Sequence, residues 1–443
     1  MKIRFGDYGM VLVLLALISL FSVLTLKRQS SSGSSAAEDV CEQVREKVSG
    51  DEMVLVVGAQ NTGSEELAKT VAARLRGQHI GSIRLVTGGP RDLRLALDDL
   101  AAAGKKPAVI ASGGEAARWR VFEQIPVNYP QFSDYVMVTP GEGIRSDFLK
   151  SSNLLAVVER IVVIAMIAIG MTMVVLTGGI DLSVGSLIAL SAVVGARVVS
   201  QMGGPEASGG AVALGFLAGM ICCGLFGMVA GGLIARLQVA PFIVTLGIMM
   251  MARGLAFMTT GGFSIDQVPD SFVWLAQGRL LGIPNTIILL FVVYTSAHIF
   301  MTHTRWGRYI YAVGGNAEAA RLSGVPVKLI ILLVYTVCGL MAGLGGCLQA
   351  SQVRAAAPNM ANMYELYVIA AVVVGGTSLS GGSGRIFGTL IGAFIIAVIQ
   401  NGMNLLGIQS YTQMFVLGSV IVIAVIFDQA RQRGGIRYLF AAN

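Results

Sequence analysis

Ten runs of apolar residues recur along this chain and constrain its fold more than any other feature. The first is Gly9–Leu26, and nine more follow Asn153, at roughly 154–177, 182–202, 211–235, 240–260, 285–303, 328–350, 365–378, 386–406 and 411–427. As an α-helix, a run of about 20 apolar residues matches the hydrocarbon core of a membrane. With 54% hydrophobic and 13% charged residues, the composition excludes a soluble globular protein. The sequence therefore predicts an all-α polytopic membrane bundle of about ten transmembrane helices.

The positive charge is concentrated on one side of this predicted bundle. Residues 29–153 hold 14 Lys/Arg against 16 Asp/Glu, whereas the remainder of the chain holds 18 against 9. If the spans alternate in direction, one face carries Lys2, Arg4, Arg236, Arg305, Arg308, Arg321, Lys328, Arg385, Arg431, Arg433 and Arg437. The opposite short loops contribute mainly Arg279 and Arg354. The positive-inside rule then places both termini and the segment Thr304–Lys328 in the cytoplasm. Membrane topology therefore explains the net charge of +7, and nucleic acid binding is not needed to explain it.

The first apolar run predicts export of the segment that follows it. Lys2 and Arg4 precede the run, and Lys27-Arg28 and a Ser-rich linker, Ser30–Ser35, follow it. The run is either a signal anchor or a cleaved signal peptide, and both alternatives export the next segment. We therefore expect a first transmembrane helix within residues 1–28 and an extracytoplasmic insert at 29–152.

The insert has the alternating pattern of a small α/β domain. Buried-type strands are predicted at 53–59, 82–87, 107–111 and 135–138, and helices at 64–76, 91–103 and 115–124. This order predicts three layers around a parallel sheet. The loop Gly58–Gly63 lies at a strand end, where α/β folds commonly bind ligands, but it lacks the spacing of a dinucleotide or phosphate-binding loop.

A glycine-rich motif occurs twice in the membrane part. Gly178–Ser186 (GGIDLSVGS) recurs as Gly375–Ser383 (GGTSLSGGS), with six of nine positions identical. Both copies follow a span that is predicted to run from outside to inside and precede a span that runs from inside to outside. The two copies therefore have the same orientation, which indicates an internal parallel repeat. Irregular backbone at membrane depth is tolerated where protein or a water-filled cavity surrounds it, so we expect the two breaks to line a transport path. A duplicated packing device at helix crossings is the alternative.

The segment Thr304–Lys328 is the long polar break between two late spans. Asn316 can cap a helix, Glu318 then lies in the first turn, and Gly324 with Pro326 stops the helix, so a short helix is predicted near 317–323. It is either a docking element for another protein or an ordinary helical loop.

Few polar side chains suggest chemistry. Arg253 is the strongest candidate for a functional charge inside the bundle, with a structural or snorkelling arginine as the alternative. Glu365 either pairs with Arg354 at the outer mouth or meets a partner protein. The histidines form no metal site, and the five cysteines suggest buried filler rather than disulfides.

The chain also lacks the phosphate-binding loop of ATPases. Uphill transport would therefore need a partner or an ion gradient, and Asp181 is the one serious candidate for an ion-coupled transporter. No cofactor bound by this chain is expected.

Four blocks in order resemble the permease subunits of ribose-type sugar ABC importers, a family that includes permeases for ribose, xylose, galactose and autoinducer-2. The blocks are Leu176–Ser186, Pro241–Gly247 with Arg253-Gly254, Gly314–Gly324, and Tyr364–Gly407 with its Gly375–Gly382 and Asn401–Gly407 segments. The resemblance covers residues 154–428. It implies a type II ABC importer-like permease domain at 153–430, followed by a cytoplasmic tail at 431–443, in a bacterial inner membrane.

The resemblance also implies partners and sites. The partners are a cytoplasmic ABC ATPase that uses ATP, an extracytoplasmic solute-binding protein and a second permease subunit. The implied ATPase-coupling loop contains Gly315, Asn316, Glu318, Ala319, Arg321, Leu322 and Gly324. The translocation path would include Gly178, Gly179, Asp181, Ser183, Arg253, Gly375, Gly376, Thr377 and Ser378, and the binding protein would contact Arg354 and Glu365.

Two features depart from that family. It usually has an acidic residue two positions after Glu365, where this chain has Tyr367, and it has a short connection where this chain has the insert. The insert keeps a second function open, that of a membrane-anchored receptor in which the α/β domain binds a solute.

Overall fold

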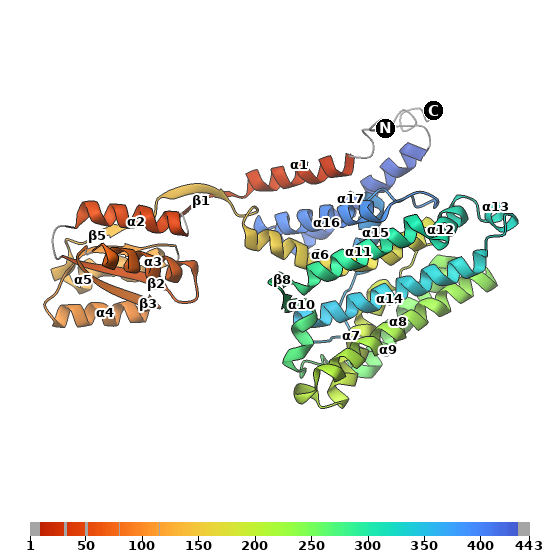
Figure 1. Ribbon diagram of the computed structural model, residues 1–443, viewed down its shortest axis with the longest axis horizontal. Coiled ribbons are helices and arrows are strands. Elements are labelled where there is room, and N and C mark those ends of the chain that lie inside the picture. Colours follow the sequence, from red (N-terminus) through yellow and green to blue (C-terminus); the bar gives the residue numbers. More distant parts are fainter. Residues whose placement is uncertain (1–8, 31–32, 49–51, 79, 115, 433–443) are drawn as a thin grey trace. The chain divides into compact units, whose positions relative to one another are not determined.

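The computed structural model describes residues 9–30, 33–48, 52–78, 80–114 and 116–432. Two compact units divide the chain (Figure 1). One unit is Leu26–Asp147, and the other combines the chain up to Thr25 with everything from Phe148 onward. Thr25 and Phe148 are joined by a hydrogen bond of 3.2 Å from the Phe148 N–H to the Thr25 hydroxyl, so the two ends of the helical unit meet where the other unit begins.

Seven helices among the described residues are long and apolar enough to cross a membrane. They are α6 (Ser151–Leu176), α7 (Val184–Gln201), α8 (Gly209–Leu237), α9 (Pro241–Thr260), α11 (Asn285–His303), α14 (Val327–Val353) and α16 (Ile386–Leu405). Three shorter apolar helices coincide with the other predicted runs: α1 (Gly9–Leu24), α15 (Tyr364–Val374) and α17 (Ser410–Gln432, apolar through Ile426).

The span predicted at 365–378 is shorter in the structure. Helix α15 has 11 residues, which is about 16 Å of helix and too short for a hydrocarbon core of about 30 Å. It ends early because Gly376 adopts a left-handed conformation with φ of 81°, which terminates a helix.

Helix α6 lies at the centre of the helical unit. Every residue from Ile161 to Leu176 is buried, against α14, α16, α15 and α11. Helices α8 and α14 run side by side (Figure 1), and the glycines at their crossing, Gly227 and Gly339, allow the two backbones to approach closely. Helix α9 instead exposes Met250 and Met258.

Short elements connect these helices. They are the 3₁₀ turns at Gly204–Glu206 and Asp270–Val273, α10 (Trp274–Gln277), the two-stranded hairpin of β7 (Arg279–Leu280) and β8 (Ile283–Pro284), α12 (Arg305–Gly315) and α13 (Ala317–Leu322).

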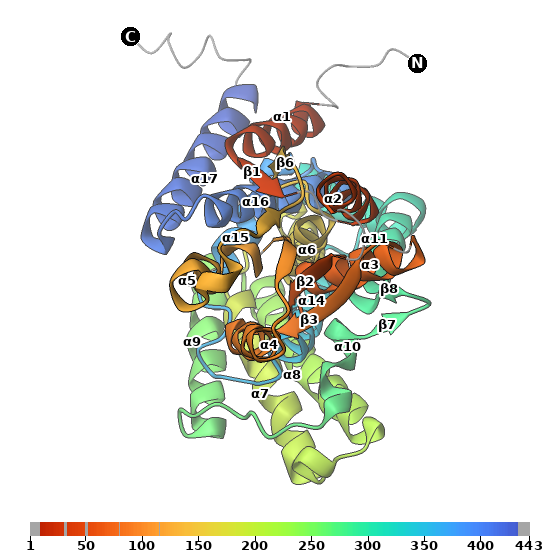
Figure 2. The same ribbon diagram turned by 90° about the vertical axis from the view of Figure 1, so that its left-hand side faces the viewer.

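The other unit is built on a four-stranded parallel sheet with strand order β3-β2-β4-β5. Its strands are β2 (Met53–Ala59), β3 (Ser82–Gly88), β4 (Pro107–Ser112) and β5 (Val136–Val138), and its helices are α2 (Ser34–Lys47), α3 (Gly63–Gly77), α4 (Pro90–Ala102) and α5 (Arg120–Asn128). Side chains alternate across β2, since Val54 and Val56 pack with α2 and α3 whereas Leu55 and Val57 pack with α4 and α5. Figure 2 shows α4 and α3 at different faces of this sheet.

Two sequence predictions for this unit need correction, and one pairing was not predicted. The Ser-rich segment Ser30–Ser35 is not simply a linker, because β1 (Leu26–Ser30) ends in it and α2 begins at Ser34. Strand β1 pairs with β6 (Glu142–Ser146) in an antiparallel ribbon that the sequence did not predict. The helix expected at 115–124 is a 3₁₀ turn at Ala116–Arg118 followed by α5, with residue 115 outside the described part.

Candidate transport site

The first glycine-rich break ends α6 with a left-handed residue. Gly178 has φ of 77°, its N–H donates to the Val175 carbonyl (2.9 Å), and the Gly179 N–H donates to the Val174 carbonyl (3.1 Å). These two bonds satisfy carbonyls that a helix end otherwise leaves free. The chain then turns back and enters α7 at Val184.

The second break ends α15 with the same pair of bonds. The Gly376 N–H donates to the Val373 carbonyl (2.8 Å) and the Thr377 N–H to the Val372 carbonyl (3.1 Å). By its conformation, Gly178 therefore corresponds to Gly376, one position later than the sequence alignment of Gly178 with Gly375.

Beyond the helix ends, the two breaks correspond as in the sequence alignment, with Asp181 matching Ser378. The Asp181 carboxylate accepts the Ser183 N–H at 2.9 Å, and the Ser378 hydroxyl accepts the Ser380 N–H at 3.2 Å. The first break thus holds one more residue than the second between its helix end and this side-chain turn.

Polar atoms gather at these breaks. Asp181 is fully buried, and its Oδ1 also accepts the Ser183 hydroxyl at 2.6 Å. The Thr377 hydroxyl and the nearby Tyr335 hydroxyl are buried without a hydrogen-bond partner among the described residues, and the Cys338 thiol lies beside the Asp181 carboxylate. Buried polar atoms are normally paired, so this concentration distinguishes the breaks from the apolar helices around them.

The segment Thr304–Lys328 forms two helices rather than one. The prediction of a helix near 317–323 is confirmed by α13, where the Asn316 side chain accepts the Ala319 N–H at 2.9 Å. Gly324 follows with φ of 85°. Glu318 and Arg321 form an exposed ion pair of 2.5 Å, which raises the pKa of Arg321.

Helix α12, which precedes α13, was not predicted. Thr304 caps it by accepting the Gly307 N–H at 3.2 Å, and Ile310 and Val313 are buried. The signals in the sequence were the capping threonine and the spacing of these two apolar residues.

The carboxyl end of α12 meets both breaks. The Gly382 N–H of the second break donates to the carbonyl of Leu176, the last residue of α6, at 2.9 Å. Gly314 packs so closely here that a Cβ would collide with the Leu176 carbonyl oxygen and would lie 2.5 Å from the Gly382 nitrogen. The Tyr311 hydroxyl donates to the Gly384 carbonyl at 2.9 Å. We call Leu176, Gly314, Gly381 and Gly382 the glycine junction, and it links the segment that carries α13 to both breaks.

A different set of contacts surrounds Arg253 in α9. Its Nη1 donates to the carbonyls of Pro358 and Met360, at 2.8 Å each. Glu365 lies close enough to interact electrostatically with Arg253. The alternative pairing of Glu365 with Arg354 is wrong, because Arg354 pairs with Asp270.

Comparisons with known proteins agree with this architecture. Residues 153–425 match the family described as the permease component of the branched-chain amino acid transport system. The chain belongs to this permease family. It is 42% identical to the ribose import permease protein RbsC of Escherichia coli K12 over 302 residues, 67% of this chain and 92% of that protein.

Two other relatives extend the comparison. The permease is 40% identical to RbsC of Bacillus subtilis 168 over 299 residues, 67% of this chain and 91% of that protein. It is 36% identical to the D-allose transport system permease protein AlsC of Escherichia coli K12 over 282 residues, 64% of this chain and 85% of that protein. No solved structure matches the chain.

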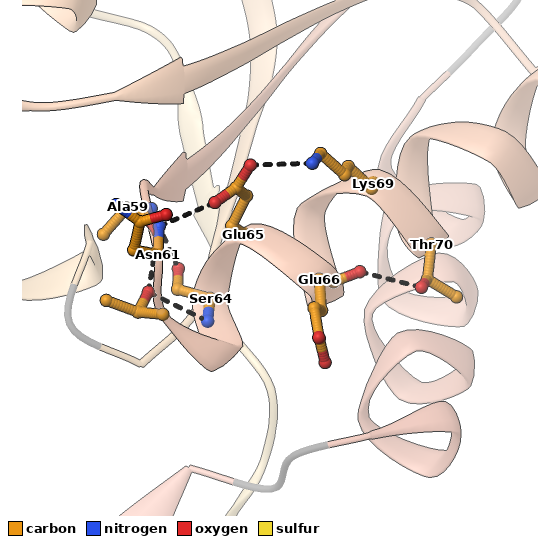
Figure 3. A network of polar contacts seen from close by, with 8 residues as sticks. Ala59, Asn61, Ser64, Glu65, Glu66, Lys69 and Thr70 are labelled. Atoms are coloured by element: carbon orange, nitrogen blue, oxygen red, sulfur yellow. Dashed lines mark hydrogen bonds and ion pairs between the residues drawn. The ribbon is translucent and has the colours of Figure 1, made fainter. Parts of the chain in front are cut away.

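The α/β unit lies outside the matched residues of the permease. The loop after β2, a candidate ligand site from its position, is engaged by its own side chains (Figure 3). The Glu65 carboxylate accepts the Asn61 N–H and pairs with Lys69, at 2.7 Å each, and Lys69 contributes most to lowering the Glu65 pKa. The Thr62 hydroxyl accepts an N–H from the first turn of α3. The start of α3 is thus capped from within the loop.

Sequence reasoning missed several residues of these sites. Tyr335 and Asp270 come from segments that the sequence analysis did not single out, and Tyr311 lies in Thr304–Lys328 but in the part of it where no helix was predicted. Gly314 was quoted only in the block Gly314–Gly324 that carries the family resemblance and was not assigned to the coupling loop, although the pair Gly314-Gly315 is a signal for close backbone approach.

Proposed function

We propose that this chain is the membrane-spanning permease subunit of an ATP-driven importer that carries a monosaccharide or a similar small polar solute. Relatives named as ribose and D-allose permeases support the sugar class. The glycine junction is the observation that carries the proposal, since it brings the backbone of the segment Thr304–Lys328 into contact with the backbone of both breaks.

The energy would enter through a partner ATPase that binds and uses ATP, while this chain binds no cofactor. Its docking surface would be α13 and its flanks: Gly315, Asn316, Glu318, Ala319, Arg321, Leu322 and Gly324. Support comes from the exposure of this surface, where Leu322 is 78% exposed beside the Glu318–Arg321 pair. An exposed apolar side chain beside exposed charges suits a protein interface.

The solute path would pass the two breaks, along Gly178, Gly179, Asp181, Ser183, Arg253, Gly375, Gly376, Thr377 and Ser378. The matching helix ends at Gly178 and Gly376 support an internal duplication, in which each half of the membrane domain contributes one break. A partner that binds one conformation of α13 better than the other would shift the junction and both breaks together.

In this topology, ten segments cross the bacterial inner membrane, one of them formed by the short helix α15 together with the second break, both termini are cytoplasmic and the α/β unit is extracytoplasmic. A solute-binding protein would dock on the outer face near Arg354 and Glu365, and a second permease subunit would complete the pathway. Of these two residues, Arg354 is the exposed one, so it is the better candidate for direct contact.

Reconstitution tests the proposal. The permease, its ATPase and the binding protein are placed in proteoliposomes, and uptake of radiolabelled ribose is measured with and without ATP. We expect uptake that requires ATP and persists when ion gradients are collapsed. Uptake that follows an ion gradient and ignores ATP would refute the ATP-driven importer.

Charge reversal tests the docking surface in the same system. Glu318→Arg or Arg321→Glu should uncouple ATP hydrolysis from uptake, whereas Glu206→Arg in the turn after α7 serves as the exposed control. Coupled uptake that is unchanged in both α13 variants would show that the ATPase docks elsewhere.

A further inference from the structure

Two opposite charges, Arg253 and Glu365, interact electrostatically within the helical unit, and we call them the charged pair. Arg253 is flanked by 12 residues of α9 before it and 7 after it, so it is far from both helix ends. Glu365 lies in the first turn of α15, and both side chains are half-buried. Charges at such depth are costly and are retained in membrane proteins mainly where they serve a pathway.

The loop between α14 and α15 is held in an unusual conformation beside this pair. Three of its non-glycine residues have positive φ: Arg354 (55°), Ala361 (52°) and Met363 (65°). Such conformations are unfavourable for residues with a side chain and cluster at ligand clamps and switches. The two hydrogen bonds from Arg253 to the Pro358 and Met360 carbonyls fix the middle of this loop.

The loop rests against the start of α7, directly after the first break. A Cβ at Gly185 would collide with the Glu365 carboxylate and would lie 2.9 Å from the Ala361 carbonyl oxygen. Glycine at this position therefore lets Glu365 approach the N-terminus of α7, where the helix dipole favours an anion. The charged pair and the first break consequently share one region of the bundle.

We propose that Arg253 and Glu365 form a binding site for the hydroxyl groups of the transported solute, within the membrane path. The assignment rests on the proposed importer function and narrows its substrate to neutral polyhydroxylated molecules. The two charges offset each other, so the site favours no net ionic charge. Both Nη1 protons of Arg253 are used by the loop carbonyls, which leaves the Nε and Nη2 protons as donors, and the Glu365 carboxylate is an acceptor. A hydroxyl group can both donate and accept. A solute hydroxyl can therefore accept a hydrogen bond from Arg253 or donate one to Glu365.

Reconstituted importer tests the site, with ribose and 2-deoxyribose as probes. Transport rates of the two sugars are compared with the binding protein loaded with sugar and present at a saturating concentration. The affinity of the binding protein for each sugar then does not affect the ratio of the two rates. Glu365→Gln and Arg253→Gln should lower ribose uptake by about tenfold, the usual effect of losing a hydrogen bond to a charged group, and should reduce the preference for ribose over its deoxy analogue. Arg279→Gln and Glu206→Gln are the exposed controls.

Two outcomes would overturn the proposed site. If ribose uptake and the preference are unchanged in Glu365→Gln, which leaves the Arg253 bonds to the loop intact, the site is refuted. If uptake falls while the preference is retained, the pair acts on the loop and not on the solute, and the assignment is again overturned. If Arg253→Gln fails to assemble, Glu365→Gln and Glu365→Asp carry the test alone. Failure of the wild-type importer to take up any sugar would instead refute the proposed function before any variant is compared.

Discussion

Substitution of Gly314 by alanine tests the glycine junction most directly. The new methyl group would meet the Leu176 carbonyl oxygen and the Gly382 nitrogen, both backbone atoms that cannot rotate away. The junction must open, which breaks the 2.9 Å hydrogen bond between these two residues at a cost of about 1–3 kcal/mol. Overpacking adds about 1–3 kcal/mol, and alanine returns about 1 kcal/mol because it favours the helical conformation of α12. The net cost of about 3 kcal/mol corresponds to a shift of about 100-fold in the population of the closed junction.

The assay is the ratio of ribose transported to ATP hydrolysed in proteoliposomes, with the thermal midpoint of the solubilised complex as a second measurement. We expect a fall in both for Gly314→Ala. The matched control is Gly418→Ala, a helical glycine of α17 with open space around it. Identical coupling ratios and midpoints for the two variants would falsify the idea that close backbone approach at Gly314 matters.

Three further predictions address other parts of the chain. Replacing Leu26–Asp147 by a short flexible linker should leave the helical unit folded and assembled, because Thr25 and Phe148 are already hydrogen-bonded. Proteolysis of the membrane part within assembled complexes checks this expectation. Uptake of ribose by the same variant shows whether the α/β unit is an accessory. The Gly141 N–H and the Gln43 side chain lower the pKa of Asp39, so this carboxylate stabilises the folded α/β unit above its unfolded pKa of about 3.9 and the contribution is lost as the pH falls through the folded value. Asp39→Asn should therefore increase hydrogen exchange in that unit at pH 7, and its effect should shrink as the pH falls below the unfolded pKa of about 3.9. Arg354→Ala should change the thermal midpoint little, since its ion pair with Asp270 is exposed and such pairs contribute about 0–1 kcal/mol.

Elements with strong local signals were predictable from the sequence. Helix α13 follows from the capping Asn316 and the stop at Gly324 and Pro326, and β2 follows from an uninterrupted apolar run. Helix α2 shows the limit, because it begins in a Ser-rich segment typical of linkers. Its Val40 and Val44 are buried against the sheet, so tertiary packing overrides the local composition.

The candidate sites depended more on tertiary contacts than on local patterns. The position of Arg253 inside an apolar span made it a candidate for an interior charge. Its acceptors, the carbonyls of Pro358 and Met360, lie about a hundred positions later in the chain and could not be predicted. The partner of Arg354 was likewise not predictable, since Asp270 is 84 positions away. The one-residue offset between the repeats arose because sequence alignment counts identities, whereas the helix end depends on which glycine adopts the left-handed conformation.

The two breaks are bonded to different helices. Each has a side-chain turn of its own, since Asp181 accepts both donors of Ser183 and Ser378 accepts the Ser380 N–H. The first break is also bonded by α9, whose Thr245 hydroxyl donates to the Ile180 carbonyl at 3.4 Å. The middle of the second break is held from outside, because the Gly382 N–H bonds to α6 and the Gly384 carbonyl accepts the Tyr311 hydroxyl of α12. A displacement of α12 therefore acts directly on the second break, and it reaches the first through Leu176 at the end of α6. If the ATPase docks on α13, the second break responds to it first, and the first break follows through Leu176.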